Sequence, residues 1–115
     1  MVDVEKMPSK MTLEETADRL AALGNPTRLS VFRLLVKAGE SGMPVGAIQS
    51  ALSVPASTLS HHIRHLVSVG LVIQDREGTT LMCRTNYPSM QGVLEFLTSE
   101  CCSLDPAGGH GVKVI

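Results

Sequence analysis

The sequence is poor in aromatic residues and has no long hydrophobic run. Its 115 residues include no Trp, one Tyr and two Phe. This scarcity excludes an aromatic platform for stacking the bases of single-stranded nucleic acid, and it argues against an aromatic-lined cofactor pocket. No stretch reaches the ~18 apolar residues of a membrane span, and the N-terminus has no apolar run of signal-peptide length. We therefore expect a cytoplasmic protein with an aliphatic core and no membrane partner.

Charge is scarce as well, and it is unevenly distributed. Charged residues make up 18% of the chain, hydrophobic residues 43%, and the net charge is -1. One folded domain is expected, small enough that burial against a second copy would help to stabilise it. Six basic residues stand against three acidic ones between Pro26 and Arg84, whereas the two ends are acidic overall. This balance permits a mildly basic binding face on an otherwise acidic body.

Helix-start signals and apolar spacing predict five helices. Thr12 with Glu15 forms a capping box, and Asn25 followed by Pro26 is a typical cap and first helical residue. Glycines follow three of the apolar runs and are expected to end them. The predicted helices run from Thr12 to Gly24, from Asn25 to a loop over 39–44, over 45–52, from Pro55 to about Val69, and from Pro88 to about Cys101.

Two short runs rich in β-prone residues follow the fourth helix. Residues 71–74 and 79–85 flank the turn 75–78, in which Gly78 is the turn residue, so a hairpin is expected. A short helix, a tight turn, a second helix with a polar outer face and a hairpin form a winged helix-turn-helix. The predicted fold class is therefore mainly α with a small β-hairpin. The alternative is a generic small helical domain with an incidental hairpin.

Three stretches coincide with one known family. They are LGNPTRLSVFRLLV (23–36), ASTLSHHIRHLVSVGLV (56–72) and the hairpin before TNYPSM. Together they resemble the ArsR/SmtB family of metal-responsive repressors, over roughly residues 13–100. The resemblance implies a homodimer built on the first and last helices, which leaves its operator when an inducer binds. The expected organisation is a flexible N-terminus (1–11), a DNA-binding and dimerisation domain (12–102) and a flexible tail (103–115).

The fourth helix would enter the major groove with its first turns foremost. Short hydroxyl groups there can approach base edges or phosphates, a histidine can donate to either, and an arginine one turn on suits a phosphate. These positions match the family's DNA-contacting stretch, although the alternative is a solvated helix face. An arginine in the hairpin turn can hold the flanking backbone or pair with Asp75 or Glu77 instead. The candidate DNA-binding residues are Ser57, Thr58, Ser60, His61, Arg64 and Arg76.

Two other histidines of the fourth helix, His62 and His65, fall off its apolar stripe. For them we expect surface exposure or phosphate contact rather than a role in a site.

The inducer is expected to be a soft element bound by cysteine. The family's cysteine site is absent from VGAIQSAL, and its Asp/His zinc site is absent from YPSMQGVLEFLTSE. Cys101 and Cys102 remain, with Cys83 on the second predicted strand. Trivalent arsenic and antimony bind thiolates strongly and have pyramidal geometry. Arsenite therefore takes three thiolate ligands, whereas methylarsenite, which already has one bond to carbon, takes two. Cys83 could be the third ligand only if its strand runs back along the last helix or if it comes from the other subunit. The alternative is that Cys83 is simply a small strand residue. No resident cofactor is expected.

Three competing interpretations remain. The same repressor could sense oxidants or persulfides through its thiols, although adjacent cysteines form only a strained disulfide. An enzyme is not expected, because no CxxC, convincing nucleophile set or Gly-rich phosphate loop is present. A winged-helix module that binds protein and never DNA is the third alternative.

Overall fold

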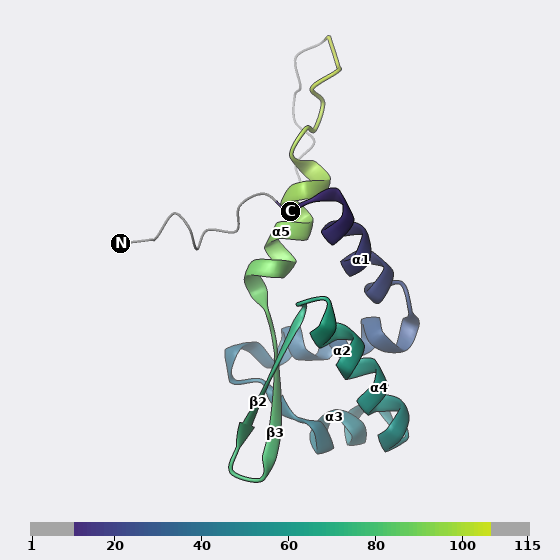
Figure 1. Ribbon diagram of the computed structural model, residues 1–115, viewed down its shortest axis with the longest axis vertical. Helices are drawn as coiled ribbons and strands as arrows, with labels where there is room; N and C mark the ends of the chain where they lie inside the picture. The colour runs from purple at the N-terminus through teal and green to yellow at the C-terminus, as the bar shows by residue number, and fades with distance from the viewer. Residues whose placement is uncertain (1–10, 107–115) are drawn as a thin grey trace, which may run out of the picture.

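The computed structural model describes residues 11–106, and these form five α-helices and a three-stranded antiparallel sheet. The chain order is α1 (Leu13–Leu23), α2 (Pro26–Ala38), β1 (Met43–Pro44), α3 (Val45–Leu52), α4 (Ala56–Ser68), β2 (Val72–Glu77), β3 (Thr80–Thr85) and α5 (Tyr87–Thr98). Helices α1 and α5 lie at one end of the molecule, and α3, α4 and the β2–β3 hairpin lie at the other (Figure 1). This architecture confirms the predicted winged helix-turn-helix.

The starts of α1 and α2 follow directly from local sequence. Thr12 Oγ1 accepts from the Glu15 N–H, and Glu15 Oε1 accepts from the Thr12 N–H, each at 3.0 Å. The Thr12 N–H stabilises the charged carboxylate and so lowers the pKa of Glu15. Asn25 Oδ1 accepts from the Arg28 N–H at 3.0 Å, with Pro26 at the first helical position. Both predicted caps are confirmed, because a cap needs only side chains within one turn.

The core is aliphatic, as the composition predicts. It gathers around α2, which contacts α1, α3, α4 and β3. Side chains from every other helix and strand except β1 and α5 join one buried cluster with it. The largest fully buried hydrophobic side chains are Val31, Leu35, Ile48, Leu59, Ile63, Leu66 and Leu71. The burial of three α4 residues in this cluster orients that helix, because its opposite face must then point to solvent.

A tight turn separates α3 from α4. Ser53 adopts a left-handed conformation (φ 54°) and donates its N–H to Gln49 O at 2.8 Å, which ends α3. Pro55 precedes α4, and the Leu59 N–H donates to Pro55 O at 2.9 Å. The three residues 53–55 redirect the chain between the two helices, as a helix-turn-helix requires.

The sheet differs from the predicted hairpin. The loop expected over 39–44 contains a 3₁₀ turn (Gly39–Ser41) and the strand β1, which pairs with Met82 and Cys83 of β3. Gly42 (φ 75°) allows this pairing, because a Cβ at that position would collide with the Cys83 carbonyl oxygen. The strand order is β1-β3-β2. A two-residue strand is too short to show alternating polarity, so the sequence pattern could not reveal it.

The hairpin and α5 also have corrected boundaries. Strand β2 extends to Glu77, so the turn contains only Gly78 and Thr79 rather than residues 75–78. Helix α5 ends at Thr98 rather than near Cys101. The Thr98 and Ser99 hydroxyls donate to the Leu94 and Phe96 carbonyls at 3.0 and 3.2 Å. Such side-chain bonds compete with continued helical bonding.

The predicted flexible ends fall mainly on residues 1–10 and 107–115, which lie outside the described residues. Within residues 11–106, no helix combines the length and apolar character needed to cross a bilayer.

Candidate nucleic-acid interface and thiol pair

Helix α4 has one buried face and one open face. Leu59, Ile63 and Leu66 are buried at helical spacing. The open face carries hydroxyl, imidazole and guanidinium groups, and helix α4 contains no acidic residue. All five candidate DNA-binding residues of this helix are exposed on it, namely Ser57, Thr58, Ser60, His61 and Arg64. The structure therefore groups the predicted contacts on one accessible surface of donors and acceptors.

The start of α4 adds to the electrostatic character of this surface. Pro55 at the cap offers no side-chain acceptor, and α4 has no side-chain cap. Among the described residues, nothing accepts from the N–H groups of Ala56, Ser57 and Thr58. Free N–H groups and the positive end of the helix dipole favour an anion such as a phosphate. This end of the helix is thus suited to a nucleic-acid backbone.

The histidines of α4 divide between the two faces. His61 is exposed, whereas His62 is half-buried with its Nδ1 3.3 Å from Arg28 Nη1 of α2. Desolvation lowers the pKa of His62, and Arg28, His61 and His65 lower it further. The expected surface or phosphate role of His62 is therefore corrected: its ring bonds inward to the protein. Sequence spacing missed the bond, because its partner lies 34 residues away.

The hairpin presents one unpaired arginine close to its tip. Arg76 is exposed and lies opposite Leu81. Asp75 pairs with Arg84 across the strands, Oδ2 to Nη2 at 3.1 Å, so it is not the partner of Arg76. Within residues 11–106, the side chain of Arg76 makes no hydrogen bond or salt bridge. Its guanidinium is therefore available to a ligand, and neither proposed pairing partner holds it.

Cys101 and Cys102 form a close thiol pair beyond α5. Their Sγ atoms are 3.2 Å apart, and both cysteines are free. Cys101 is exposed and Cys102 is half-exposed, in a left-handed conformation (φ 65°). The hydrogen bond with the Cys102 thiol raises the pKa of Cys101. Both sulfurs are thus accessible and adjacent, and the Cys101 thiol is held protonated near neutral pH.

Cys83 lies in a different environment. Its side chain is fully buried in the core cluster, and Gln74 Nε2 donates to its Sγ at 3.5 Å. Burial raises the pKa of this thiol. Among residues 11–106, no three His, Cys, Asp or Glu side chains gather as a metal site. The structure therefore gives Cys83 the place of a small core residue and does not bring it to the thiol pair within one protomer.

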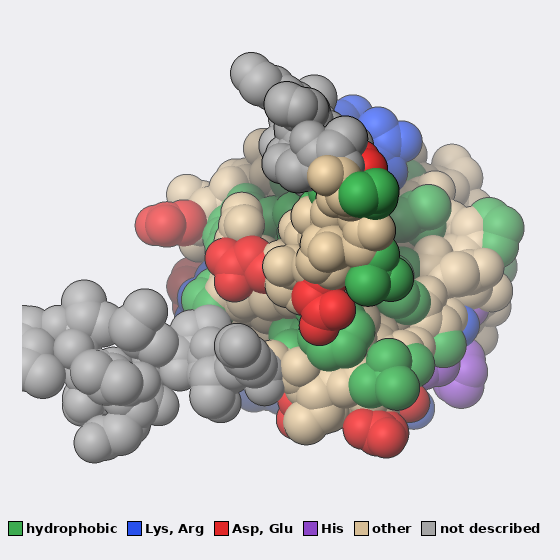
Figure 2. All heavy atoms as spheres, turned by 90° about the horizontal axis from the view of Figure 1, so that it is seen from above, with side chains coloured by type: hydrophobic (Ala, Val, Ile, Leu, Met, Phe, Trp, Pro, Cys, Tyr) green, Lys and Arg blue, Asp and Glu red, His purple; other side chains and the backbone are tan. Residues whose placement is uncertain are grey.

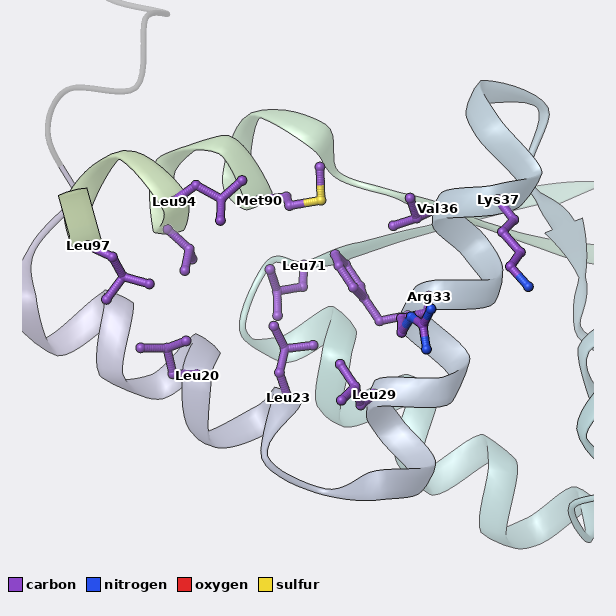
Figure 3. A pocket seen from close by; sticks show the side chains of 12 residues that line it. Leu20, Leu23, Leu29, Arg33, Val36, Lys37, Leu71, Met90, Leu94 and Leu97 are labelled. Carbon is purple, nitrogen blue, oxygen red and sulfur yellow. The ribbon is translucent and has the colours of Figure 1, made fainter. Parts of the chain in front are cut away.

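An apolar groove opens at the other end of the molecule. It encloses about 430 Å³ between α1, α2 and α5. Leu20 and Leu23 of α1 point toward Leu94 and Leu97 of α5 across it (Figure 3). Four leucines of α1 and α5 are substantially exposed: Leu13 (65%), Leu20 (39%), Leu94 (42%) and Leu97 (58%). Seen from this end, hydrophobic and acidic side chains alternate on the surface (Figure 2). Such a surface is typical of an interface with another protein.

The start of α5 is hydrogen-bonded to α2 and to the segment that directly follows α4. Asn86 Nδ2 donates to Gly70 O at 2.8 Å, directly after the end of α4. The Asn86 N–H donates to Leu71 O at 2.9 Å, and the Tyr87 hydroxyl donates to Val36 O of α2 at 3.2 Å. Asn86 and Tyr87 were not predicted from the sequence as functional residues. They connect the helix that precedes the thiol pair to the end of α4.

Comparisons with known proteins agree with this geometry. Residues 23–75 match the protein family described as Helix-turn-helix domain. An uncharacterized HTH-type transcriptional regulator of Methanocaldococcus jannaschii is 39% identical over 66 residues, which cover 57% of this chain and 72% of the relative. The transcriptional repressor PagR of Bacillus anthracis is 30% identical over 88 residues, covering 76% and 85% of the two chains.

A solved structure extends the similarity to the whole fold. The homodimeric winged helix-turn-helix DNA-binding domain of a possible ArsR-family regulator from Mycobacterium bovis has a TM-score of 0.61 and 29% identity. The alignment covers 86% of this chain and 90% of that domain. The fold of this chain is therefore similar to that of a domain described as DNA-binding.

Proposed function

Since this chain belongs to the ArsR-like family of DNA-binding helix-turn-helix transcriptional regulators, we propose that it is a homodimeric repressor released from its operator by a trivalent arsenical. The observation that carries the choice of inducer is the accessible pair Cys101–Cys102, with sulfurs 3.2 Å apart.

The α4 surface supports DNA binding in the major groove. Its exposed hydroxyls and His61 suit base edges or phosphates, and Arg64 suits the backbone. Arg76 is unpaired and can reach the flanking backbone or minor groove. One protomer supplies few phosphate contacts, so a monomer would bind weakly and in a salt-sensitive way.

A dimer through α1 and α5 supplies the missing affinity. The exposed leucines of these helices would be covered by the same face of a second copy. Two-fold pairing places two copies of α4 about one helical turn of DNA apart, on a palindromic site. A nearly neutral chain can then bind its operator because both halves bind together.

The thiol pair suits a centre that needs two sulfurs. Zinc–thiolate bonds are about 2.3 Å long. If bonds from sulfur to another soft atom have a similar length, two sulfurs 3.2 Å apart can both bind that atom without large movement. A methylated arsenical carries one carbon and two exchangeable hydroxyls. Each thiol would replace one hydroxyl, forming an As–S bond and releasing one water. Inorganic arsenite needs a third sulfur, and burial of Cys83 counts against it as that ligand. The geometry therefore favours the methylated form over arsenite.

Binding at the thiol pair would act on DNA through α5. A ligand there constrains the segment directly after α5. At the other end of α5, Asn86 bonds to the segment after α4 and Tyr87 bonds to α2. A changed angle between the subunits would then misplace the two α4 helices. Release by tenfold to a hundredfold requires a coupling free energy of only ~1.4 to 2.8 kcal/mol.

The test is a titration of the complex with an operator duplex obtained by in vitro selection. Methylarsenite should release the wild type, arsenite should act more weakly, and zinc should have no effect. Cys101→Ser and Cys102→Ser should each abolish the response, whereas Cys83→Ser should keep it.

Several outcomes would overturn parts of this proposal. Release by zinc alone would contradict the thiol site, and release by peroxide that requires Cys83 would favour a redox sensor. A strong arsenite response lost in Cys83→Ser would show a three-thiolate site. Failure to select any duplex would remove the DNA-binding function itself.

A further inference from the structure

Arg28 joins three helices at one corner of the molecule. Its Nε donates to Ala22 O in the last turn of α1 at 2.7 Å, and its backbone N–H binds the cap of its own helix, Asn25. Its Nη1 lies 3.3 Å from His62 Nδ1 on α4. Among the described residues, this is the only side-chain hydrogen bond between α4 and another helix or strand.

The chemistry of the two groups fixes the direction of the bond. A guanidinium has only N–H donors, so His62 Nδ1 must accept and the ring proton must sit on Nε2. A second proton on His62 would place two donors and two positive charges against each other. The link therefore requires a neutral His62.

The surroundings of His62 keep it neutral at ordinary pH. Desolvation is the main cause of its lowered pKa. Arg28 reaches it from α2, and His61 and His65 flank it on α4; all three lower the pKa in addition. Helix α1 and strand β2 also pack against α4, and no carboxylate from them or elsewhere in residues 11–106 acts on the ring.

The position of the bond matters for DNA recognition. The buried side chains of α4 itself are the aliphatic Leu59, Ile63 and Leu66, whose contacts are not directional, and the bond from Asn86 reaches only Gly70 beyond the end of the helix. A hydrogen bond to a charged donor is directional and stronger than a neutral one. His62 follows His61 of the polar face in the chain and is itself half-buried, so its bond can fix the rotation of α4 about its own axis.

We propose that His62 is a positioning residue for operator binding: its bond to Arg28 sets the rotation of α4 relative to the α1–α2 corner. This inference rests on the proposed DNA-binding role of the α4 face. It assigns His62 no DNA contact, and it makes operator affinity depend on a neutral imidazole at this position.

The test compares His62→Asn with His62→Phe. The Asn Oδ1 can occupy the place of Nδ1 and accept from Arg28, whereas Phe keeps a ring but offers no acceptor. His62→Phe should weaken operator binding by about tenfold, and His62→Asn by no more than about twofold. Nonspecific binding to an unrelated duplex should remain unchanged in both. His65→Asn and His65→Phe serve as matched controls and should not differ from each other.

A pH series separates positioning from simple stability. Protonation of His62 at low pH breaks the link in the wild type, whereas the neutral amide of His62→Asn keeps its acceptor at every pH. The wild type should therefore lose affinity relative to His62→Asn as the pH falls. Two results would overturn the role of the Arg28–His62 bond and leave the DNA-binding proposal standing. One is a constant ratio of wild-type to His62→Asn affinity across the pH series, and the other is equal binding by wild type and folded His62→Phe at neutral pH. If the wild type binds no duplex at any pH, the DNA-binding proposal fails and this inference with it.

Discussion

Helices α4 and α5 are both half-buried, yet their open faces differ in chemistry. The open face of α4 carries Ser, Thr, His and Arg side chains, whereas that of α5 carries Leu94 and Leu97 beside Glu95. Polar donors without acids suit nucleic acid, and apolar residues beside an acid suit another protein. The comparison shows that one small core can support two chemically different surfaces at opposite ends, because the core determines only which face points outward.

The largest effect is expected from a charge placed on the α5 face. Leu97→Glu puts a carboxylate into the proposed dimer contact, where desolvating it is costly. We expect dissociation to monomers and a loss of operator affinity of roughly a hundredfold, because the two halves no longer bind together. Sedimentation equilibrium and duplex titration measure the two effects.

Leu104→Glu is the matched control, because Leu104 is 96% exposed and does not line the groove. It should leave both quantities unchanged. A dimeric Leu97→Glu variant with full affinity would show that α5 is not the partner surface.

A smaller effect is expected from removing one basic group on α4. Arg64→Ala should weaken binding by about tenfold for all sequences and reduce the salt dependence by about one ion per protomer. Lys37→Ala removes another exposed positive charge, at the rim of the apolar groove, and should change neither the affinity nor its salt dependence. Equal losses in the two variants would mean that binding follows total charge rather than the α4 surface.

The two arginines of the hairpin allow a finer test. Arg76 has no ion pair among the described residues, whereas Arg84 is paired with Asp75. Arg76→Ala should weaken operator binding by about threefold without changing stability. Arg84→Ala should leave binding nearly unchanged and lower the free energy of unfolding by at most ~1 kcal/mol, as for exposed ion pairs. The opposite pattern would place Arg84, not Arg76, at the DNA.

The smallest effect concerns stability against pH. The lowered pKa of His62 means that the unfolded chain binds its proton first. The stabilisation is therefore complete above the ordinary histidine pKa of about 6.5, and it is lost as the pH falls through the folded value. Thermal unfolding should show a slightly larger decrease for the wild type than for His62→Asn between about pH 7.5 and 5.5. An equal decrease would contradict the lowered pKa.

Local features were predictable wherever one turn of chain contained the cause. The caps at Thr12 and Asn25, the apolar stripe of α4 and the exposure of its polar face (Ser57, Ser60, His61 and Arg64) all follow from residues a few positions apart. The strand β1 and the end of α5 could not be predicted. Strand β1 depends on pairing with β3, and the end of α5 depends on side-chain bonds back to helix carbonyls.

The cysteines show the same division. The adjacency of Cys101 and Cys102 is a property of the sequence, and the structure places their sulfurs within contact. The burial of Cys83 depends on three strands meeting and on α2 packing against β3. No spacing rule distinguishes a strand cysteine that faces the core from one that faces a site.

Helical periodicity and cap residues already determined the order of the helices and the polar face of α4, because both result from interactions within a few residues. Only the tertiary structure determined three pairings. Arg28 bonds to His62, Asn86 bonds to the segment after α4, and Asp75 forms its ion pair with Arg84 rather than with Arg76. These pairs join residues that are 9 to 34 positions apart. Their geometry depends on how whole helices and strands pack, which a linear pattern does not encode.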